Sequence, residues 1–173
     1  SKLVLNGYAK TFSKIFNTIQ ENNLNAKIIK EDFDNNILVV NVLDYKASNM
    51  LGASSWCIQY NENYFNDYVV ANKEVNCSAL NNAQLIIWDF NREQTDKRSM
   101  YGVTVSKEGI KAAHYQDDSN CPFSEIEQDY SDLLTIDYWA DISDDVIVPQ
   151  INNSDIKRNE KLIYRIRNPK KSI

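Results

Sequence analysis

The sequence predicts an α+β domain with a mainly antiparallel sheet, an N-terminal amphipathic helix and further helices on its flanks. Two observations lead to this prediction: helices and strands are unevenly interspersed, and most strand-like segments follow one another closely enough to form hairpins. Only one connection is long enough for a parallel pair, which argues against a doubly wound sheet. The 173 residues fit one domain, and we assign residues 1–156 to it and residues 157–173 to a basic C-terminal strand and tail.

The first predicted element is an amphipathic helix over Tyr8–Leu24, in which apolar side chains recur at helical spacing. Two strands follow, Lys27–Phe33 and Ile37–Leu43, joined by the polar turn Asp34–Asn36. The second strand is apolar on both faces, so we expect it inside the sheet and not at an edge.

A short helix is expected at Tyr45–Leu51, because Asp44 can cap its first turn and Gly52 follows its last turn. The next segment, Ser55–Tyr60, is interpreted as a strand or as a junction between a strand and a helix. A second helix is expected over Asn61–Ala71, where aromatic side chains lie at helical spacing.

The clearest strand of the chain is Gln84–Phe90, an almost continuous apolar run. A charged connection, Arg92–Ser99, separates it from the next strands. Those are Tyr101–Val105 and Ile110–Tyr115, which we expect to form a hairpin in which Gly109 takes a positive φ.

The last third of the chain has weaker patterns. Ser124 and Glu127 have the spacing of a capping box, which predicts a helix over Ser124–Leu134. Leu162–Arg167 alternates apolar and basic residues, which predicts an edge strand.

Charge is distributed in blocks. Residues 112–156 hold 11 acidic residues and no lysine or arginine, whereas residues 157–173 hold seven basic residues and one acidic residue. The acidic block predicts either a solvated face or a surface for a basic protein partner. It would also repel phosphates, which argues against binding of nucleic acid.

The three cysteines cannot all pair within one chain, and their spacing does not fit a zinc site. We interpret Cys57, Cys77 and Cys121 as reduced thiols in a cytoplasmic protein. No run of 18 apolar residues exists, so no membrane contact is expected. Calcium-loop spacing and phosphate-binding glycine motifs are missing as well, so we expect no metal and no cofactor.

Four short motifs occur in a fixed order along residues 44–120. They are W-C-I at Trp56–Ile58, Y-F-x-x-Y at Tyr64–Tyr68, I-W-D-F at Ile87–Phe90 and G-V-T-V at Gly102–Val105. This order resembles a group of tailed-phage and mobile-element proteins. The resemblance implies a phage protein, placed in the host cytoplasm or in the virion, and implies no particular activity.

Our leading functional hypothesis is a non-enzymatic protein that binds another protein. It depends on the acidic block and on the lack of recognised catalytic signatures. The contact surface would be the acidic face or the aromatic cluster of residues 60–68. The residues we expect to make the contact are Tyr64, Tyr68, Asp141, Asp144 and Asp145.

The alternative is a thiol hydrolase or transferase. Cys57 would be the nucleophile, His114 the general base, and Asp117, or its neighbour Asp118, would orient the imidazole. This hypothesis requires Cys57 to be open to a cleft that also contains His114. The competing interpretation is a buried cysteine, because W-C-I is also typical of a core strand.

Overall fold

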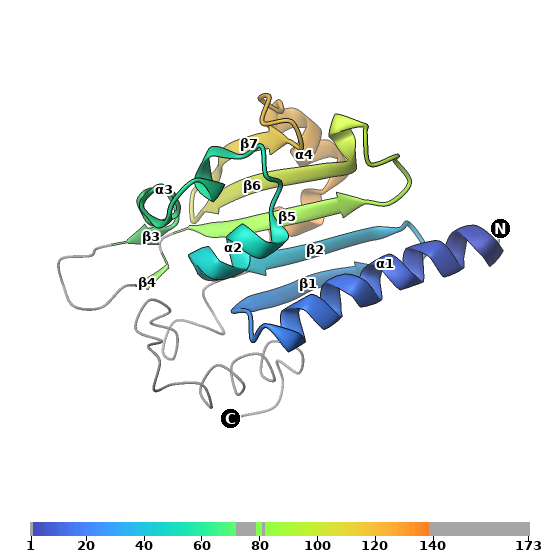
Figure 1. Cartoon of the computed structure of the whole chain (residues 1–173). Helices are drawn as coiled ribbons and strands as arrows, with labels where there is room; N and C mark the ends of the chain where they lie inside the picture. The colour runs from blue at the N-terminus through green and yellow to red at the C-terminus, as the bar shows by residue number, and fades with distance from the viewer. Residues whose placement is uncertain (1, 72–78, 81, 139–173) are drawn as a thin grey trace.

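The computed structural model describes residues 2–71, 79–80 and 82–138 of the chain (Figure 1). The protein is an α+β structure, as the sequence predicts. Its elements, in chain order, are α1 (Lys2–Glu21), β1 (Ala26–Asp32), β2 (Ile37–Val42), α2 (Tyr45–Leu51), η1 (Cys57–Gln59), α3 (Glu62–Tyr68), β3 (Val70–Ala71), β4 (Ala79–Leu80), β5 (Ala83–Asp89), η3 (Lys97–Ser99), β6 (Met100–Ser106), β7 (Gly109–Tyr115), α4 (Phe123–Asp129) and η4 (Ser131–Leu134).

The main sheet has five strands in the order β1-β2-β5-β6-β7, and every neighbouring pair is antiparallel. The expected antiparallel sheet is therefore confirmed, and β2 lies inside it, as its apolar faces predict. The segment between β2 and β5 leaves the sheet to form α2, η1, α3 and the small β3–β4 pair (Figure 1).

Helices cover both faces of the sheet, because successive side chains of a strand point to opposite faces. One core lies between the sheet and α1, α2, η1 and α3 and includes Phe12, Leu38, Val40, Ala47, Trp56, Phe65 and Ile86. The other lies between the sheet and α4 with η4 and includes Val39, Leu85, Ile87, Val103, Ile126 and Leu133. The result is a three-layer arrangement with the sheet in the middle.

Two local sequence signals act as predicted. Asp44 caps α2, because its Oδ1 accepts a hydrogen bond of 2.9 Å from the Ala47 backbone N–H. Asn25 Nδ2 donates a second bond of 2.7 Å to the same carboxyl group, while burial raises the pKa of Asp44. Gly109 closes the turn between β6 and β7 with a φ of 128°, a conformation that favours glycine.

The predicted bounds of three elements need correction. The first helix is Lys2–Glu21 and not Tyr8–Leu24, and Asn22 and Asn23 form the turn that follows it. Ser55–Tyr60 contains no strand: Cys57–Gln59 is a single 3₁₀ turn. The predicted helix Asn61–Ala71 ends early, since the chain leaves α3 at Val69 to pair with β4.

The predicted capping box of the last helix is also wrong. Pro122 occupies the N-cap position of α4, so Ser124 lies inside the first turn and no side chain caps the helix. The predicted helix is divided into α4 and η4, with Tyr130 between them in a non-helical conformation. The predicted strand Leu162–Arg167 lies outside the described residues.

Candidate functional site

The segment Ala53–Tyr60 crosses the face of the sheet at β6 and β7, and Trp56 attaches it there. The indole Nε1 of Trp56 donates a hydrogen bond of 2.9 Å to the backbone carbonyl oxygen of Tyr115, at the end of β7. The Ser55 hydroxyl donates to the carbonyl of Gln116. A Cβ on Gly102 would lie 3.1 Å from two ring carbons of Trp56, so the indole packs directly on the β6 backbone. Trp56 is only 3% exposed.

A second set of bonds holds the other end of this turn against α2. Gln59 Nε2 donates a hydrogen bond of 2.7 Å to the carbonyl oxygen of Ser48, and the Ser48 hydroxyl donates one of 3.1 Å to Gln59 Oε1. The phenol of Tyr45 donates a hydrogen bond of 2.9 Å to the carbonyl oxygen of Gln59. Cys57 therefore lies on a short turn that is fixed on both sides, and its side chain is half-buried.

A cavity of about 120 Å³ lies between this turn and strands β5, β6 and β7. Its walls combine an apolar part with several polar groups from four separate segments of the chain. The lining residues are Trp56, Cys57, Ile58, Gln84, Gly102, Thr104, Ala112, His114 and Asp118.

Two buried polar side chains meet across β5 and β6 in this cavity. Gln84 is opposite Thr104 in the strand register, and the Thr104 hydroxyl donates a hydrogen bond of 2.6 Å to Gln84 Oε1. Gln84 is 4% exposed. Within the described ranges, the amide nitrogen of Gln84 has no hydrogen-bond partner and is not fully buried, so it can donate to water or to a ligand in the cavity.

The other side of the cavity comes from β7 and the turn after it. His114 is opposite Gly102 in the register and is half-buried. Asp118 has a φ of 71°, and its backbone N–H donates a hydrogen bond of 3.0 Å to the carbonyl oxygen of Tyr115. A positive φ is uncommon for residues other than glycine, although aspartate adopts it more readily than most. The turn thereby brings a carboxyl group to the cavity, and none of the described lining residues is Lys or Arg.

The structure thus brings together two of the three residues predicted for thiol chemistry. Cys57 and His114 line the same cavity, although no hydrogen bond joins their side chains in the described part of the chain. Asp117 is not among the residues that line the cavity. Its Oδ1 accepts a hydrogen bond of 3.0 Å from the Ser119 backbone N–H, and hydrogen bonds from Ser119 lower the pKa of this carboxyl group. The carboxyl group on the cavity is that of Asp118.

The residues predicted for protein binding are less fully described. Tyr64 is 43% exposed on α3, and Tyr60 beside it is 68% exposed. Met50, at the end of α2, is also exposed. The side chain of Tyr68 lies outside the described part of the structure, and so do Asp141, Asp144 and Asp145.

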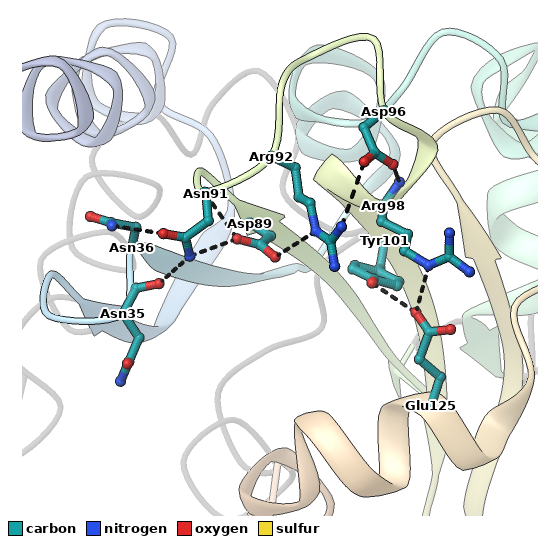
Figure 2. A network of polar contacts seen from close by, with 9 residues as sticks. All are labelled: Asn35, Asn36, Asp89, Asn91, Arg92, Asp96, Arg98, Tyr101 and Glu125. Carbon is teal, nitrogen blue, oxygen red and sulfur yellow. Dashed lines mark hydrogen bonds and ion pairs between the residues drawn. The ribbon is translucent and has the colours of Figure 1, made fainter. Parts of the chain in front are cut away.

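A polar network around Glu125 of α4 lies on the opposite face of the sheet (Figure 2). Glu125 of α4 accepts hydrogen bonds of 2.8 Å from the Tyr101 phenol and 2.6 Å from the Tyr115 phenol, and Arg98 Nε lies 3.8 Å from Glu125 Oε2. The bond to Glu125 raises the pKa of Tyr115, and burial together with the same carboxylate raises that of Tyr101. The network holds Tyr115, whose backbone carbonyl accepts the Trp56 bond.

The same network continues along one end of the sheet, as Figure 2 shows. The guanidinium group of Arg92 forms ion pairs of 3.7 Å with the carboxyl groups of Asp89 and Asp96. Asn91 Nδ2 donates a hydrogen bond of 2.7 Å to the carbonyl oxygen of Asn35 in the β1–β2 turn. These groups are mostly exposed and contribute little individually. We interpret them as structural.

Comparison of the chain with protein-family models, with curated proteins and with solved structures finds no match. Of the helices in the described ranges, none has both the length and the apolar character needed to cross a membrane. Among the same residues, no three His, Cys, Asp or Glu side chains gather closely enough to hold a metal ion. The function must therefore be argued from the cavity and from the exposed surface.

Sequence reasoning missed Gln84, Gly102 and Thr104 as parts of the site. All three lie in strands, where the pattern of apolar residues hides them. The available signal was the polar pair Gln84 and Thr104 inside otherwise apolar strands, which becomes informative only once the register places them opposite each other.

Proposed function

We propose that this protein is a thiol hydrolase or acyltransferase that uses Cys57 as its nucleophile. The observation that supports the proposal is that Cys57 and His114, from distant parts of the sequence, line one cavity. A nucleophilic thiol needs a base nearby and access to its substrate, and the cavity provides both. The absence of a Cys57–His114 hydrogen bond does not argue against this role, because such bonds often form only when substrate is bound.

The reaction follows from these positions. His114 takes the proton of the Cys57 thiol, and Sγ attacks the carbonyl carbon of the substrate. The bond to the leaving group breaks, and His114 returns the proton to that group, which leaves Cys57 as a thioester. Water or a second nucleophile then attacks the thioester and releases Cys57. Asp118, rather than Asp117, is the carboxyl group that we assign to orient His114.

Trapping of the acyl intermediate tests this proposal. Incubation with p-nitrophenyl acetate should transfer an acetyl group to Cys57 with release of p-nitrophenolate, and peptide mapping by mass spectrometry locates the adduct. His114→Ala should slow acetylation of Cys57 by about 100-fold, the size typical of general-base assistance. Cys121→Ser is the matched control, because Cys121 is buried on the other face of the sheet. Equal acetylation of Cys57 with and without His114 would overturn the proposal.

A second candidate function is protein binding through the aromatic surface, which we define as Met50, Tyr60 and Tyr64. These side chains are exposed on α2, on α3 and on the residue after η1, three segments that contact one another. Exposed aromatic side chains are typical anchors of protein interfaces. The phage resemblance suggests a host or virion protein as the partner, and the acidic residues Asp141, Asp144 and Asp145 would extend the contact.

Capture from a bacterial lysate tests this second function. A specific partner should be lost with Tyr60→Ser/Tyr64→Ser and weakened by charge reversal at Asp141, Asp144 and Asp145. It should be kept with Phe123→Ser, because Phe123 is similarly exposed, at 43%, but lies at the start of α4. Capture that is the same for all variants would rule out the aromatic surface.

A further inference from the structure

The cavity also indicates which chemical group it accepts. We propose that it binds an uncharged carboxamide, such as the side-chain amide of glutamine or asparagine in a substrate, and excludes carboxylates. This inference rests on the thiol function proposed above and adds the class of substrate.

The side-chain amide of Gln84 offers a polar group to a ligand in the cavity. One of its two polar atoms bonds to the Thr104 hydroxyl at 2.6 Å, and the other has no partner within the described ranges. The assignment of nitrogen and oxygen in an amide does not affect this conclusion, because either orientation leaves one atom unpaired. The unpaired atom is open to the cavity, so a ligand there can form a hydrogen bond with it in place of water. A carboxamide offers both a donor and an acceptor and can pair with either orientation.

The charge of the cavity lining favours an uncharged ligand. Among the described residues that line the cavity, Asp118 contributes a carboxyl group and none is Lys or Arg. A carboxylate ligand would therefore enter without a fixed cation to pair with and close to a group of like charge. An ammonium ligand could approach Asp118, but it offers only donors, so it can pair with Gln84 in only one of the two amide orientations, whereas a carboxamide can pair in both.

The size of the cavity also limits the ligand. At about 120 Å³ the cavity is smaller than a site for a drug-sized ligand, which occupies about 300–1,000 Å³. It fits a group the size of one amide side chain. The indole of Trp56 and the side chain of Ile58 supply apolar walls for the carbon atoms of such a group.

Three alkylating reagents of different charge test the inference on the full-length protein. Iodoacetamide is an uncharged carboxamide, iodoacetate is its carboxylate analogue, and 2-bromoethylamine is a cation. The rate of modification of Cys57 by each is measured in the native protein and divided by the rate in the urea-unfolded protein, which removes intrinsic reactivity. We expect this normalised rate to be at least about tenfold higher for iodoacetamide than for iodoacetate. The hydrogen bond to the Gln84 amide favours iodoacetamide, and the negative charge of Asp118 disfavours iodoacetate.

Substitutions of residues that line the cavity show which of them cause the preference for iodoacetamide over iodoacetate. Gln84→Met conserves volume and removes the amide, so the iodoacetamide-to-iodoacetate ratio should fall about fivefold, the size of one neutral hydrogen bond. Gln84→Leu is a second variant, used if Gln84→Met does not give the native circular dichroism spectrum. Asp118→Asn should also lower the ratio, by admitting iodoacetate, and asparagine tolerates the positive φ of this position.

The outcomes separate the two claims. Modification of Cys57 that depends on His114 but has the same ratio in native and unfolded protein would overturn the carboxamide inference alone. A normalised rate that is highest for 2-bromoethylamine would overturn it too, in favour of a cation site. Failure of all three reagents to modify native Cys57, or rates independent of His114, would overturn the thiol function and the inference with it.

Discussion

The indole of Trp56 donates a hydrogen bond of 2.9 Å to the backbone carbonyl of Tyr115. This bond connects the turn that carries Cys57 to the end of the strand that carries His114. On the opposite face of the sheet, the phenol of Tyr115 donates a hydrogen bond of 2.6 Å to the carboxylate of Glu125. The geometry of the cavity therefore depends on contacts from both layers of helices.

Replacement of Trp56 tests how far this bond stabilises the fold. Trp56→Phe removes one of the two hydrogen bonds that the Tyr115 carbonyl accepts and leaves the one from the Asp118 backbone N–H, so we expect the free energy of unfolding to fall by about 0.5–1.5 kcal/mol. Urea unfolding followed by far-UV circular dichroism measures the change. Trp88→Phe is the control: Trp88 is partly buried, and its indole nitrogen has no hydrogen bond to another described residue. Equal losses in the two variants would mean that the Trp56 bond adds nothing beyond packing.

The close approach of Gly102 to Trp56 gives a second prediction. In Gly102→Ala the new methyl group would lie 3.1 Å from the ring, so the indole must move and stability should fall by about 1 kcal/mol. We also expect slower alkylation of Cys57, because the turn shifts away from His114. Gly109→Ala should destabilise by a similar amount through its φ of 128°, with no other group within 4 Å and no effect on Cys57. An unchanged Cys57 rate in Gly102→Ala would contradict the account.

Glu125 gives a prediction about tyrosine titration. Glu125→Gln replaces the carboxylate that accepts the Tyr115 hydrogen bond with a weaker, neutral acceptor and also removes its negative charge, so the pKa of Tyr115 should fall toward its ordinary value of 10.0. Absorbance at 295 nm as a function of pH measures the change. Glu127→Gln, at an exposed position of the same helix, is the matched control. If the two variants titrate alike, Glu125 is not the cause of the shift.

Stability at alkaline pH follows from the same side of the sheet. The pKa values of Tyr101, Tyr130 and Tyr138 are raised, mainly by burial, above the ordinary 10.0, and burial also raises that of Cys121 above 9.0. The unfolded chain releases these protons at lower pH than the folded chain. The stabilisation is therefore complete below about pH 9 and is lost as the pH rises further.

Urea unfolding between pH 7 and pH 11 measures this loss. We expect a constant free energy of unfolding from these groups up to about pH 9 and a steady fall above it. Tyr130→Phe removes one of the groups and should make the fall shallower. A free energy that increases between pH 9 and pH 11 would contradict the assignment.

The parts of the fold that the sequence predicts well depend on neighbouring residues. Asp44 and Gly109 act through their own backbone conformation and the next few residues, so their signals are visible without a structure. The continuous apolar character of β2 likewise indicates its place inside the sheet.

The site was harder to predict because it depends on distant contacts. Trp56–Ile58 has the composition of a core strand, yet the segment lies in a turn held by a bond from Trp56 to Tyr115 and by a bond from Gln59, the next residue, to Ser48. The sequence suggested Cys57 and His114 as possible partners but could not show that they line one cavity. The distinction between Asp117 and Asp118 depends on a single positive φ, and the roles of Gln84 and Thr104 depend on the strand register.

The central claim, that Cys57 is a thiol activated by His114, is tested most directly by its rate of carbamidomethylation in the native protein. The rate at Cys57 is measured by peptide mapping at neutral pH, with the buried Cys121 as an internal reference. The account predicts that Cys57 is modified before unfolding and faster than Cys121, and that His114→Ala slows Cys57 by at least about tenfold. A Cys57 that stays unmodified until the protein unfolds, or that reacts equally fast without His114, would contradict it.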